Sequence, residues 1–546
     1  MDSKTLRAKS GEIMESHSKV AAVTSCPEGA LAPELALARP RTGMVAVLPR
    51  VFSFPAMLGV LLIVGVFGTG RQFVLDPDCW WHVKTGEIIL SSHHWPTTDP
   101  YSFTVTGQPW LAYEWGGDVV LATAARLAGL QALDGVLILF AAAVMIALYC
   151  LATLCAGNSK AAFIASAALL PLAVPSFNLR PQMLGYLFLI LTLIALERFR
   201  QGKRSALWFL PLLFLVWINT HGSWIIGLGV VATYWLSGLF DFRAGGLEAL
   251  PWNPTERRQI SFVFLLCLCA LPVTPYGTRL STYPFEVASS LPVSMTSILE
   301  WQPMPFNLVG GKLFLGLLLA FFLVQVTGRF AWRLEQLTLF VFGAAMATIH
   351  VRFMLLFVPF FAPLLATILA QWIPAYERQK DRYALNAVLI AAAIVGMIHY
   401  FPSGTDLEKK AAQNFPVAAV EYLNQHPVPE PMFNSYGFGG YLIWSRWPEH
   451  KVFVDGRSEL YEHGGVLSDY MQVSQIRPPA LAILRFYGIR SCLLDRDESF
   501  ATVLSALPEW QKVYSDNRSV LFVRRDSASS GTVVQEKPPV KPVDQE

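Results

Sequence analysis

Charged residues are scarce in this sequence: Asp, Glu, Lys and Arg together make up 15% of its 546 residues, against about 25% in an average soluble chain. Hydrophobic residues make up 53%, and the mean hydropathy is +0.43. These values are typical of an integral membrane protein. The net charge of +3 is too small to indicate nucleic acid as a partner, and membrane topology explains the positive charges better.

Cysteines with metal-site spacing are also lacking. The seven cysteines form no CxxC motif and no Cys/His pair with the spacing of a zinc site. Cys267 and Cys269 lie inside an apolar run, which favours buried free thiols. The sequence therefore implies no cofactor with certainty and leaves a divalent metal ion open.

The beginning of the sequence lacks the apolar run of a cleaved signal peptide. Residues 1–47 instead contain Ala-Pro-Glu and Arg-Pro-Arg clusters, which predict a disordered cytoplasmic tail. Residues 526–546 are rich in Ser, Lys and Pro and predict a second disordered tail. The folded protein is expected to lie between these tails.

Apolar runs long enough to cross a membrane, or nearly so, occupy most of residues 48–401. We expect an α-helical polytopic membrane domain with about 11 transmembrane helices. The predicted spans are 52–70, 132–155, 160–176, 182–199, 206–220, 223–240, 259–273, 312–328, 334–350, 352–372 and 383–401.

The basic residues predict the orientation of these spans. Every second loop holds a cluster of basic residues, one of which consists of Arg198, Arg200, Lys203 and Arg204. The loops between them hold mostly isolated cations. By the positive-inside rule the N-terminus is cytoplasmic and the region after residue 402 is extracytoplasmic. A topology reporter fused after residue 402 is expected to be active only outside the cytoplasm, and one at Arg200 only inside. The reverse pattern would place the first loop and the polar ends of the other spans on the cytoplasmic face.

The first outer loop, residues 71–131, has a composition typical of a functional site. It begins with Asp76-Pro77-Asp78 directly after an apolar run, and Pro77 restricts its own φ angle and the conformation of Asp76. Asp78 is well placed to cap a helix from about 79 to 91. On that helix Asp78 and His82 share one face because they are four residues apart.

The same loop continues with a second predicted helix, from about 111 to 127. Glu114 and Asp118 lie four residues apart on it, and a turn-rich segment with Asp99 before a proline connects the two helices. Helix capping and an interfacial belt of tryptophans explain part of this composition. They leave Asp76, His82 and Glu114 unexplained, so we favour a functional loop.

Further polar residues occur at the outer ends of other predicted spans. Charged or imidazole groups at membrane depth normally face a cavity or one another, which predicts one water-accessible site on the outer face. Simpler interpretations are helix-end contacts for Arg180, turn capping for the Asn-Thr-His-Gly segment, interfacial anchoring for Glu300-Trp301 and snorkelling for Arg352. The candidate binding residues are Arg180, Gln182, Asn219, His221, Glu300, Trp301 and Arg352.

Residues 402–525 are less apolar and predict a small extracytoplasmic α/β domain. Helices are expected at 411–423, near 477–487 and near 498–507, and short strands at 451–454, 491–494 and 520–523. Asp455 and Arg457 are predicted either to reach the site of the membrane domain or to form a local salt bridge.

Six sequence segments carry a resemblance to a known class of enzymes. These segments are DPDCWWHVKTGEII, TDPYSFTVTGQPWLAYEW, LRPQM, WINTHGSWIIG, ILEWQP and VFVDGR. They resemble a poorly characterised bacterial group of the C-type (GT-C) glycosyltransferases, which are multispan enzymes that take a sugar from a polyprenyl-phosphate carrier. The resemblance covers about residues 52–525. It implies a GT-C-like fold, a location in the bacterial inner membrane and hexosyl or pentosyl transfer to an unknown cell-envelope acceptor.

The resemblance also implies roles for individual residues. In GT-C enzymes an acid of the first outer loop is the catalytic base, and this position matches Asp76 or Asp78, with His82 and Glu114 nearby. Outer-loop arginines hold the carrier phosphate, to which Arg180 and Arg352 correspond by location only. The long motifs of the oligosaccharyltransferase branch are absent, so metal dependence stays open.

Two other functions fit parts of the sequence. An ion-coupled membrane transporter also places acids and histidines in a cavity, but it is expected to carry ionisable groups near the middle of its spans, and here the middles are nearly free of charge. A non-catalytic membrane assembly or sensing protein would leave the acidic first loop unexplained. A glycosyltransferase surrounded by membrane lipid accounts for more of the sequence than either.

Overall fold

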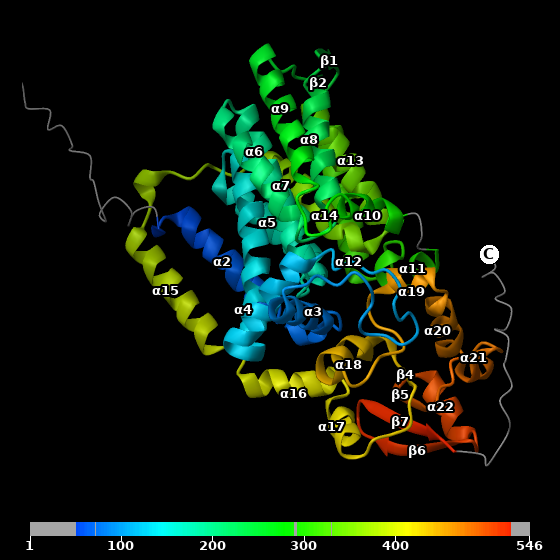
Figure 1. Ribbon diagram of the computed structural model, residues 1–546. Coiled ribbons are helices and arrows are strands. Elements are labelled where there is room, and N and C mark those ends of the chain that lie inside the picture. Colours follow the sequence, from blue (N-terminus) through cyan, green and yellow to red (C-terminus); the bar gives the residue numbers. More distant parts are fainter. Residues whose placement is uncertain (1–50, 71, 289–291, 329, 526–546) are drawn as a thin grey trace, which may run out of the picture. The chain divides into compact units, whose positions relative to one another are not determined.

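The computed structural model describes residues 51–70, 72–288, 292–328 and 330–525, and helices predominate among them (Figure 1). The two predicted tails, 1–47 and 526–546, lie outside the described residues. Each apolar run predicted as a span forms helix. The α-helices before residue 402 are α2 (Phe54–Gly68), α3 (Cys79–Ser92), α4 (Trp115–Ala156), α5 (Ser159–Ala173), α6 (Gln182–Arg200), α7 (Leu210–Ile218), α8 (Trp224–Ser237), α9 (Pro254–Ala270), α10 (Arg279–Ala288), α11 (Pro292–Ser297), α12 (Val309–Thr327), α13 (Leu334–Ile349), α14 (Met354–Leu369) and α15 (Tyr383–His399).

Short 3-10 turns lead into or out of several of these helices. They are η1 (Phe73–Leu75), η2 (Val174–Ser176), η3 (Arg204–Phe209), η4 (Leu299–Trp301), η5 (Val351–Phe353), η6 (Arg378–Lys380) and, later in the chain, η7 (Tyr436–Phe438). A small sheet orders as β1-β2-β3, with β1 (Phe242–Ala244) antiparallel to β2 (Leu247–Ala249) and β2 parallel to β3 (Trp332–Arg333).

Among the described residues, five helical segments are long and apolar enough to cross a membrane, or six if α15 and α16, which meet at 59°, form one bent span. The five are Trp115–Ala156, Ser159–Ser176, Gln182–Arg200, Val309–Val326 and Val351–Leu369. The chain is therefore a multi-pass membrane protein. Four shorter apolar helices coincide with other predicted spans. The predicted total of eleven spans and their orientation stay predictions.

The second helix predicted in the first loop, from about 111 to 127, has different bounds in the structure. It starts at Trp115, not at 111, because the residues before it bind elsewhere; for example, the Ala112 N–H donates to the Tyr276 hydroxyl at 3.1 Å. It then continues to Ala156 across a break at Ala128 and Gly129, where Gly129 has φ +58°. This positive φ suits glycine, which lacks a Cβ atom.

Residues 402–525 form a four-stranded sheet with surrounding helices. Its order is β4-β5-β7-β6: β4 (Met432–Asn434) is parallel to β5 (Ser491–Asp495), and β7 (Ser519–Arg524) is antiparallel to both β5 and β6 (Trp510–Ser515). In the register Phe433 pairs with Cys492, and Cys492 with Phe522. The helices are α16 (Gly404–Asn414), α17 (Val417–Gln425), α18 (Gly439–Arg446), α19 (Ser458–His463), α20 (Val466–Ser474), α21 (Ala480–Phe486) and α22 (Ser499–Ala506).

Two predictions for this region were wrong. The helix expected at 411–423 is divided into α16 and α17 at Phe415-Pro416, since Pro416 restricts the residue before it. The strand expected at 451–454 is absent: Val452 forms only an isolated parallel bridge with Ser102 of the first loop. The short strand β4 was not predicted, because three closely spaced prolines directly precede it in the sequence.

Buried side chains of the first loop and of residues 402–525 belong to one hydrophobic core. Trp80 of α3 contacts Phe415, Tyr441 and Trp444 at ring-centroid distances of 5.4, 5.1 and 4.8 Å. Phe433 of β4 belongs to the same core. A second core fills the helices from α4 to α14. The loop with the unusual polar residues is therefore held between the membrane helices and the C-terminal region.

Candidate functional site

Arg180 lies at the centre of a cluster of carboxylates. It precedes α6 in a turn in which its N–H donates to the Asn178 carbonyl. Its Nε and Nη2 donate to Asp76 Oδ2 and Oδ1 at 2.8 and 2.9 Å, and Nη1 lies 3.0 Å from Asp78 Oδ2 and 3.4 Å from Glu300 Oε1. The bidentate contact with Asp76 uses the planar fork of the guanidinium. The interpretation of Arg180 as a helix-end contact was wrong.

The two acids of the Asp-Pro-Asp segment have different environments. The side chain of Asp76 is 2% exposed, and its Oδ1 also accepts the Asp78 N–H at 3.0 Å, whereas the side chain of Asp78 is 13% exposed. Burial raises the pKa of Asp78 to about 7, and the negative charge of Asp76 adds to this rise while Arg180 opposes it. Asp78 occupies the N-cap position of α3, but its side chain makes no capping hydrogen bond. Asp78, not Asp76, is therefore the more accessible acid, contrary to the capping interpretation.

Glu300 joins Arg180 to a second arginine. Its Oε2 lies 3.8 Å from Arg352 Nη1, and the guanidinium of Arg352 lies 4.9 Å from the centroid of the Trp301 ring. The His350 ring contacts the Trp301 carbonyl through Nδ1 at 2.6 Å, which fixes η4 against η5. The side chains of Glu300 and Arg352 are 37% and 31% exposed, so this end of the cluster is open.

A second polar cluster forms around His82. Its Nδ1 lies 2.6 Å from Asp118 Oδ1 and its Nε2 lies 3.5 Å from Glu114 Oε2. Asp78 and His82 therefore bind different partners although both belong to one helix face. Burial lowers the pKa of His82 well below its usual value. The same cause raises the pKa of Glu114 to about 8, with Arg352 opposing the rise.

His221 completes this cluster from the opposite side. Its Nδ1 accepts the Ser223 N–H at 3.0 Å, and its Nε2 lies 3.2 Å from Glu114 Oε1. Burial lowers the pKa of His221 to about 3, so the ring is neutral at pH 7. Since Nδ1 accepts, Nε2 carries the hydrogen, and this nitrogen faces Glu114. One carboxyl group thus faces two imidazole rings.

Asn219 and Gln182, also predicted as binding residues, lie in different surroundings. Asn219 accepts from Trp115 Nε1 at 3.0 Å and donates to the carbonyls of Leu215 and Val273. These contacts fix the turn between α7 and α8, as the capping interpretation expected. Gln182 lines a cavity together with Glu300 and Arg352.

This cavity has a volume of about 290 Å³ and lies beside the open end of the arginine cluster. Its remaining walls are mostly apolar and come from the end of α5, the segment before α12 and the start of α14. They include Leu172, Met304, Leu308 and Met354. The cavity therefore has a polar end at Glu300 and Arg352 and an apolar remainder.

The C-terminal region closes the site from the other side. A Cβ atom on Gly456 would lie 1.7 Å from Asp78 Oδ1, and one on Gly440 would lie 2.2 Å from the Pro77 carbonyl oxygen. Neither glycine was predicted from the sequence, and neither was Glu459 of α19. Burial raises the pKa of Glu459, on which the charges of Arg457 and Arg352 also act. The Asp-Gly-Arg-Ser-Glu segment was the available signal, since it combines a loop glycine with charges.

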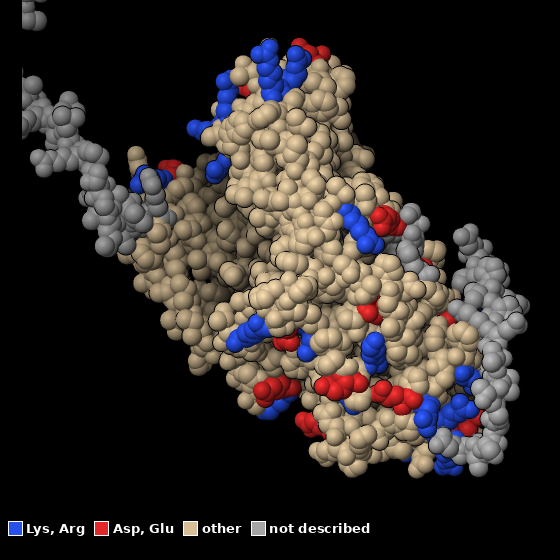
Figure 2. Space-filling model, viewed as in Figure 1, with Lys and Arg blue, Asp and Glu red and all other residues tan. Residues whose placement is uncertain are grey.

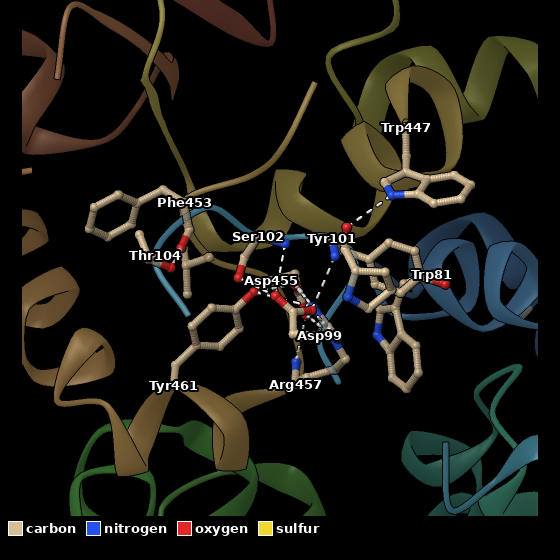
Figure 3. Close-up of polar contacts among 12 residues, drawn as sticks. Trp81, Asp99, Tyr101, Ser102, Thr104, Trp447, Phe453, Asp455, Arg457 and Tyr461 are labelled. Atoms are coloured by element: carbon tan, nitrogen blue, oxygen red, sulfur yellow. Dashed lines mark hydrogen bonds and ion pairs between the residues drawn. The ribbon is translucent and has the colours of Figure 1, made fainter. Parts of the chain in front are cut away.

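A buried arginine joins the first loop to the C-terminal region. Arg457, 1% exposed, donates from Nε and Nη2 to Asp455 at 2.8 and 2.7 Å, and its Nη1 lies 2.8 Å from Asp99 Oδ1 (Figure 3). The Tyr461 hydroxyl also donates to Asp455, and the Ser102 N–H donates to Asp99 at 2.9 Å. Arg457 thus forms the predicted local salt bridge and also reaches the membrane domain's loop, at Asp99.

Replacing Gly456 by alanine is expected to displace Asp78. The new methyl group would overlap Asp78 Oδ1, and overpacking of this kind costs about 1–3 kcal/mol. We expect a lower melting temperature together with reduced activity in an assay of the proposed function. Gly437→Ala is the matched control, because a Cβ atom there has no neighbour within 4 Å. Equal melting temperatures for the two variants would contradict the close contact.

The cluster provides carboxylates and imidazoles, but within the described ranges no three or more His, Cys, Asp or Glu side chains are placed to hold a metal ion. Arg180 lies between Asp76, Asp78 and Glu300 and supplies the positive charge that balances these carboxylates. The chemistry that these side chains offer includes proton transfer by acids or imidazoles and the binding of an anion by two arginines.

No family model and no curated protein matches this sequence. The chain is similar to solved structures of ArnT from Cupriavidus metallidurans. The one bound to undecaprenyl phosphate has 14% identity and a TM-score of 0.43, with 90% of this chain and 100% of that chain covered. The apo state has 15% identity and a TM-score of 0.45, with 85% and 97% covered. It is also similar to the oligosaccharyltransferase AglB from Archaeoglobus fulgidus in complex with an inhibitory peptide and a dolichol-phosphate, at 10% identity and a TM-score of 0.45, with 80% and 69% covered.

Proposed function

We propose that the protein is a membrane glycosyltransferase that moves a sugar from a polyprenyl-phosphate carrier to an acceptor hydroxyl at the outer face of the membrane. The observation that carries this proposal is the position of Arg180 and Arg352. They share Glu300 at the polar end of an otherwise apolar cavity, next to two further acids. A lipid phosphate needs this combination of an anion site and an apolar wall.

In the proposed reaction Asp78 removes the proton of the acceptor hydroxyl, and the acceptor oxygen forms a bond with the anomeric carbon of the sugar. The bond between that carbon and the phosphate oxygen breaks, and its electron pair leaves with the polyprenyl phosphate. Arg352 and Arg180 stabilise the negative charge of the leaving phosphate. A pKa of about 7 suits Asp78 to this role, because a general base is most effective when its pKa is near the working pH.

Asp76 and the His82 cluster are assigned supporting roles. Asp76 holds the guanidinium of Arg180 by two hydrogen bonds and thereby fixes its direction. Glu114 lies between His82 of α3 and His221. It therefore belongs to a connected set of acids and imidazoles. The acids of the Asp-Pro-Asp segment precede α3 rather than lying in the middle of a span, an arrangement that supports an enzyme more than an ion-coupled transporter.

Replacement of Arg180 and Arg352 by lysine tests the proposal. A lysine keeps the charge but cannot form two parallel hydrogen bonds, and a hydrogen bond to a charged group contributes about 1.5–3 kcal/mol. We expect the double variant to bind a polyprenyl-phosphate sugar about 10- to 100-fold more weakly in a direct titration. Arg279→Lys is the control, because Arg279 lies outside the cluster. Unchanged donor affinity in a stable double variant would contradict phosphate binding here.

A further inference from the structure

A second cavity lies at the other end of the helices that lead to the site. Helix α2 begins at this cavity and runs towards the Asp-Pro-Asp segment, while α5 begins near it and ends at the first cavity. Its volume is about 340 Å³. A helix the length of α5 spans about 22 Å at 1.5 Å per residue. The two cavities therefore lie near opposite faces of the membrane.

The acidic side chains at this second cavity already have partners. Asp381 accepts from the Phe54 N–H at 3.0 Å and from Asn386 at 2.7 Å, and Glu377 pairs with Lys380 at 2.8 Å. The remaining cations, Lys160 and Arg382, form no ion pair with any residue that the structure describes. Among the described residues, the Lys160 ammonium group donates to the Ala375 carbonyl, at 3.5 Å. The cavity thus offers two cationic groups to an incoming anion.

The rest of the cavity wall is apolar and continues along two helices. Phe54 and Met57 of α2 face Leu385 and Leu389 of α15 across it, and the two leucines are 50% and 43% exposed. Figure 2 shows charged side chains where the chain enters α15 and mostly uncharged surface along that helix. An occupant needs an anionic head at Lys160 and Arg382 and an apolar tail along α2 and α15.

We propose that this cavity binds the phosphate of an anionic phospholipid, with its acyl chains between α2 and α15. Basic pockets between membrane helices are suited to such head groups. A soluble phosphate compound would use the same cations but would leave the apolar walls unfilled. This inference concerns the opposite end of the helices from the arginine cluster and does not depend on the proposed glycosyl transfer.

The test is a titration of the purified full-length protein in neutral detergent, with bound lipid counted by native mass spectrometry. Phosphatidylglycerol is compared with phosphatidylcholine and with glycerol 3-phosphate. A basic residue near an anionic lipid surface contributes about 1 kcal/mol, equal to about fivefold in affinity. We expect phosphatidylglycerol to bind at least tenfold more tightly than phosphatidylcholine, and K160Q/R382Q to lose about 25-fold.

The control variant K409Q/K410Q removes the same charge from α16 and is expected to bind phosphatidylglycerol like the unmodified protein. Thermal unfolding shows whether each variant is folded, and a single R382Q variant, expected to lose about fivefold, replaces the double variant if that one is unstable. Equal binding of the two phospholipids, or retained binding by the folded variants, would overturn the proposal. An equal loss of phosphatidylglycerol affinity in K409Q/K410Q would show that net charge alone causes the effect, and this would also overturn the proposal. Equally tight binding of glycerol 3-phosphate would identify a soluble ligand and overturn the lipid assignment.

Discussion

Asp78→Asn is expected to lower the rate of sugar transfer by about 10²- to 10⁴-fold, the usual contribution of a general base. Asparagine has nearly the same shape, so its side chain still fits beside Gly456, where there is no spare room. The amide of asparagine, however, cannot remove the proton from the acceptor hydroxyl. Because Asp78 makes no side-chain cap on α3, the helix is expected to keep its stability. The measurement is transfer from a polyprenyl-linked sugar by purified protein, together with its melting temperature.

The pH dependence provides an independent measurement. Asp78 acts as a base only when ionised, and burial raises its pKa to about 7, so kcat/KM is expected to rise as pH increases through about 7 and then to level off. In Asp78→Asn this rise disappears from the residual activity. Asp241→Asn, an exposed acid far along the sequence from the site, is expected to keep both rate and profile. Full transfer by folded Asp78→Asn would place the base elsewhere, and Asp76→Asn is then the next variant to assay.

Arg457→Met is expected to destabilise the protein by about 3–5 kcal/mol, the usual effect of removing one partner from a buried ion pair. Arg457 lies between Asp455 and Asp99, and the side chains of all three residues are 0% exposed. Without the guanidinium both carboxylates stay buried with no cation to neutralise them. Denaturant-induced unfolding, followed by tryptophan fluorescence, measures the loss.

The controls separate this ion pair from a general effect of arginine removal. Arg477→Met replaces an exposed arginine whose side chain donates to the nearby Gln475 and is expected to change stability by less than about 0.5 kcal/mol. Asp99→Asn combined with Arg457→Met is expected to destabilise less than the sum of the single variants, because they share one interaction. Strict additivity would show that Arg457 does not act through Asp99.

The sequence predicted which polar residues come together better than it predicted their individual contacts. Arg180 and Glu300 were recognised because charged residues at the ends of apolar helices are rare, and the structure brings them within 3.4 Å. The choice between Asp76 and Asp78 depended on Arg180, 104 residues further along the chain. No local pattern specifies a contact over such a distance. The capping rule gave Asp78 the wrong role because a tertiary ion pair holds its carboxylate instead.

The contacts with residues 402–525 were the least predictable. Gly456 lies against Asp78 because it has no side chain, but glycine is common in loops and by itself indicates no particular contact. Strand β4 was not predicted because three residues that directly follow a proline-rich segment give no clear periodicity, although all three are buried. The apolar runs, by contrast, were all found as helices, since the requirement to bury or shield backbone polar groups in lipid acts locally.

The hydrophobic core shared by the first loop and the C-terminal region has a consequence for synthesis of the chain. Trp81 and Phe433 belong to this core, and 352 residues separate them (433 − 81). Chain elongation at about 5–20 residues per second places their appearance roughly 20–70 s apart. During that time the tryptophans of the nascent loop have no native cover. The protein therefore finishes folding only after its last helix has been inserted, and a prematurely terminated chain presents an aromatic surface to proteases and chaperones.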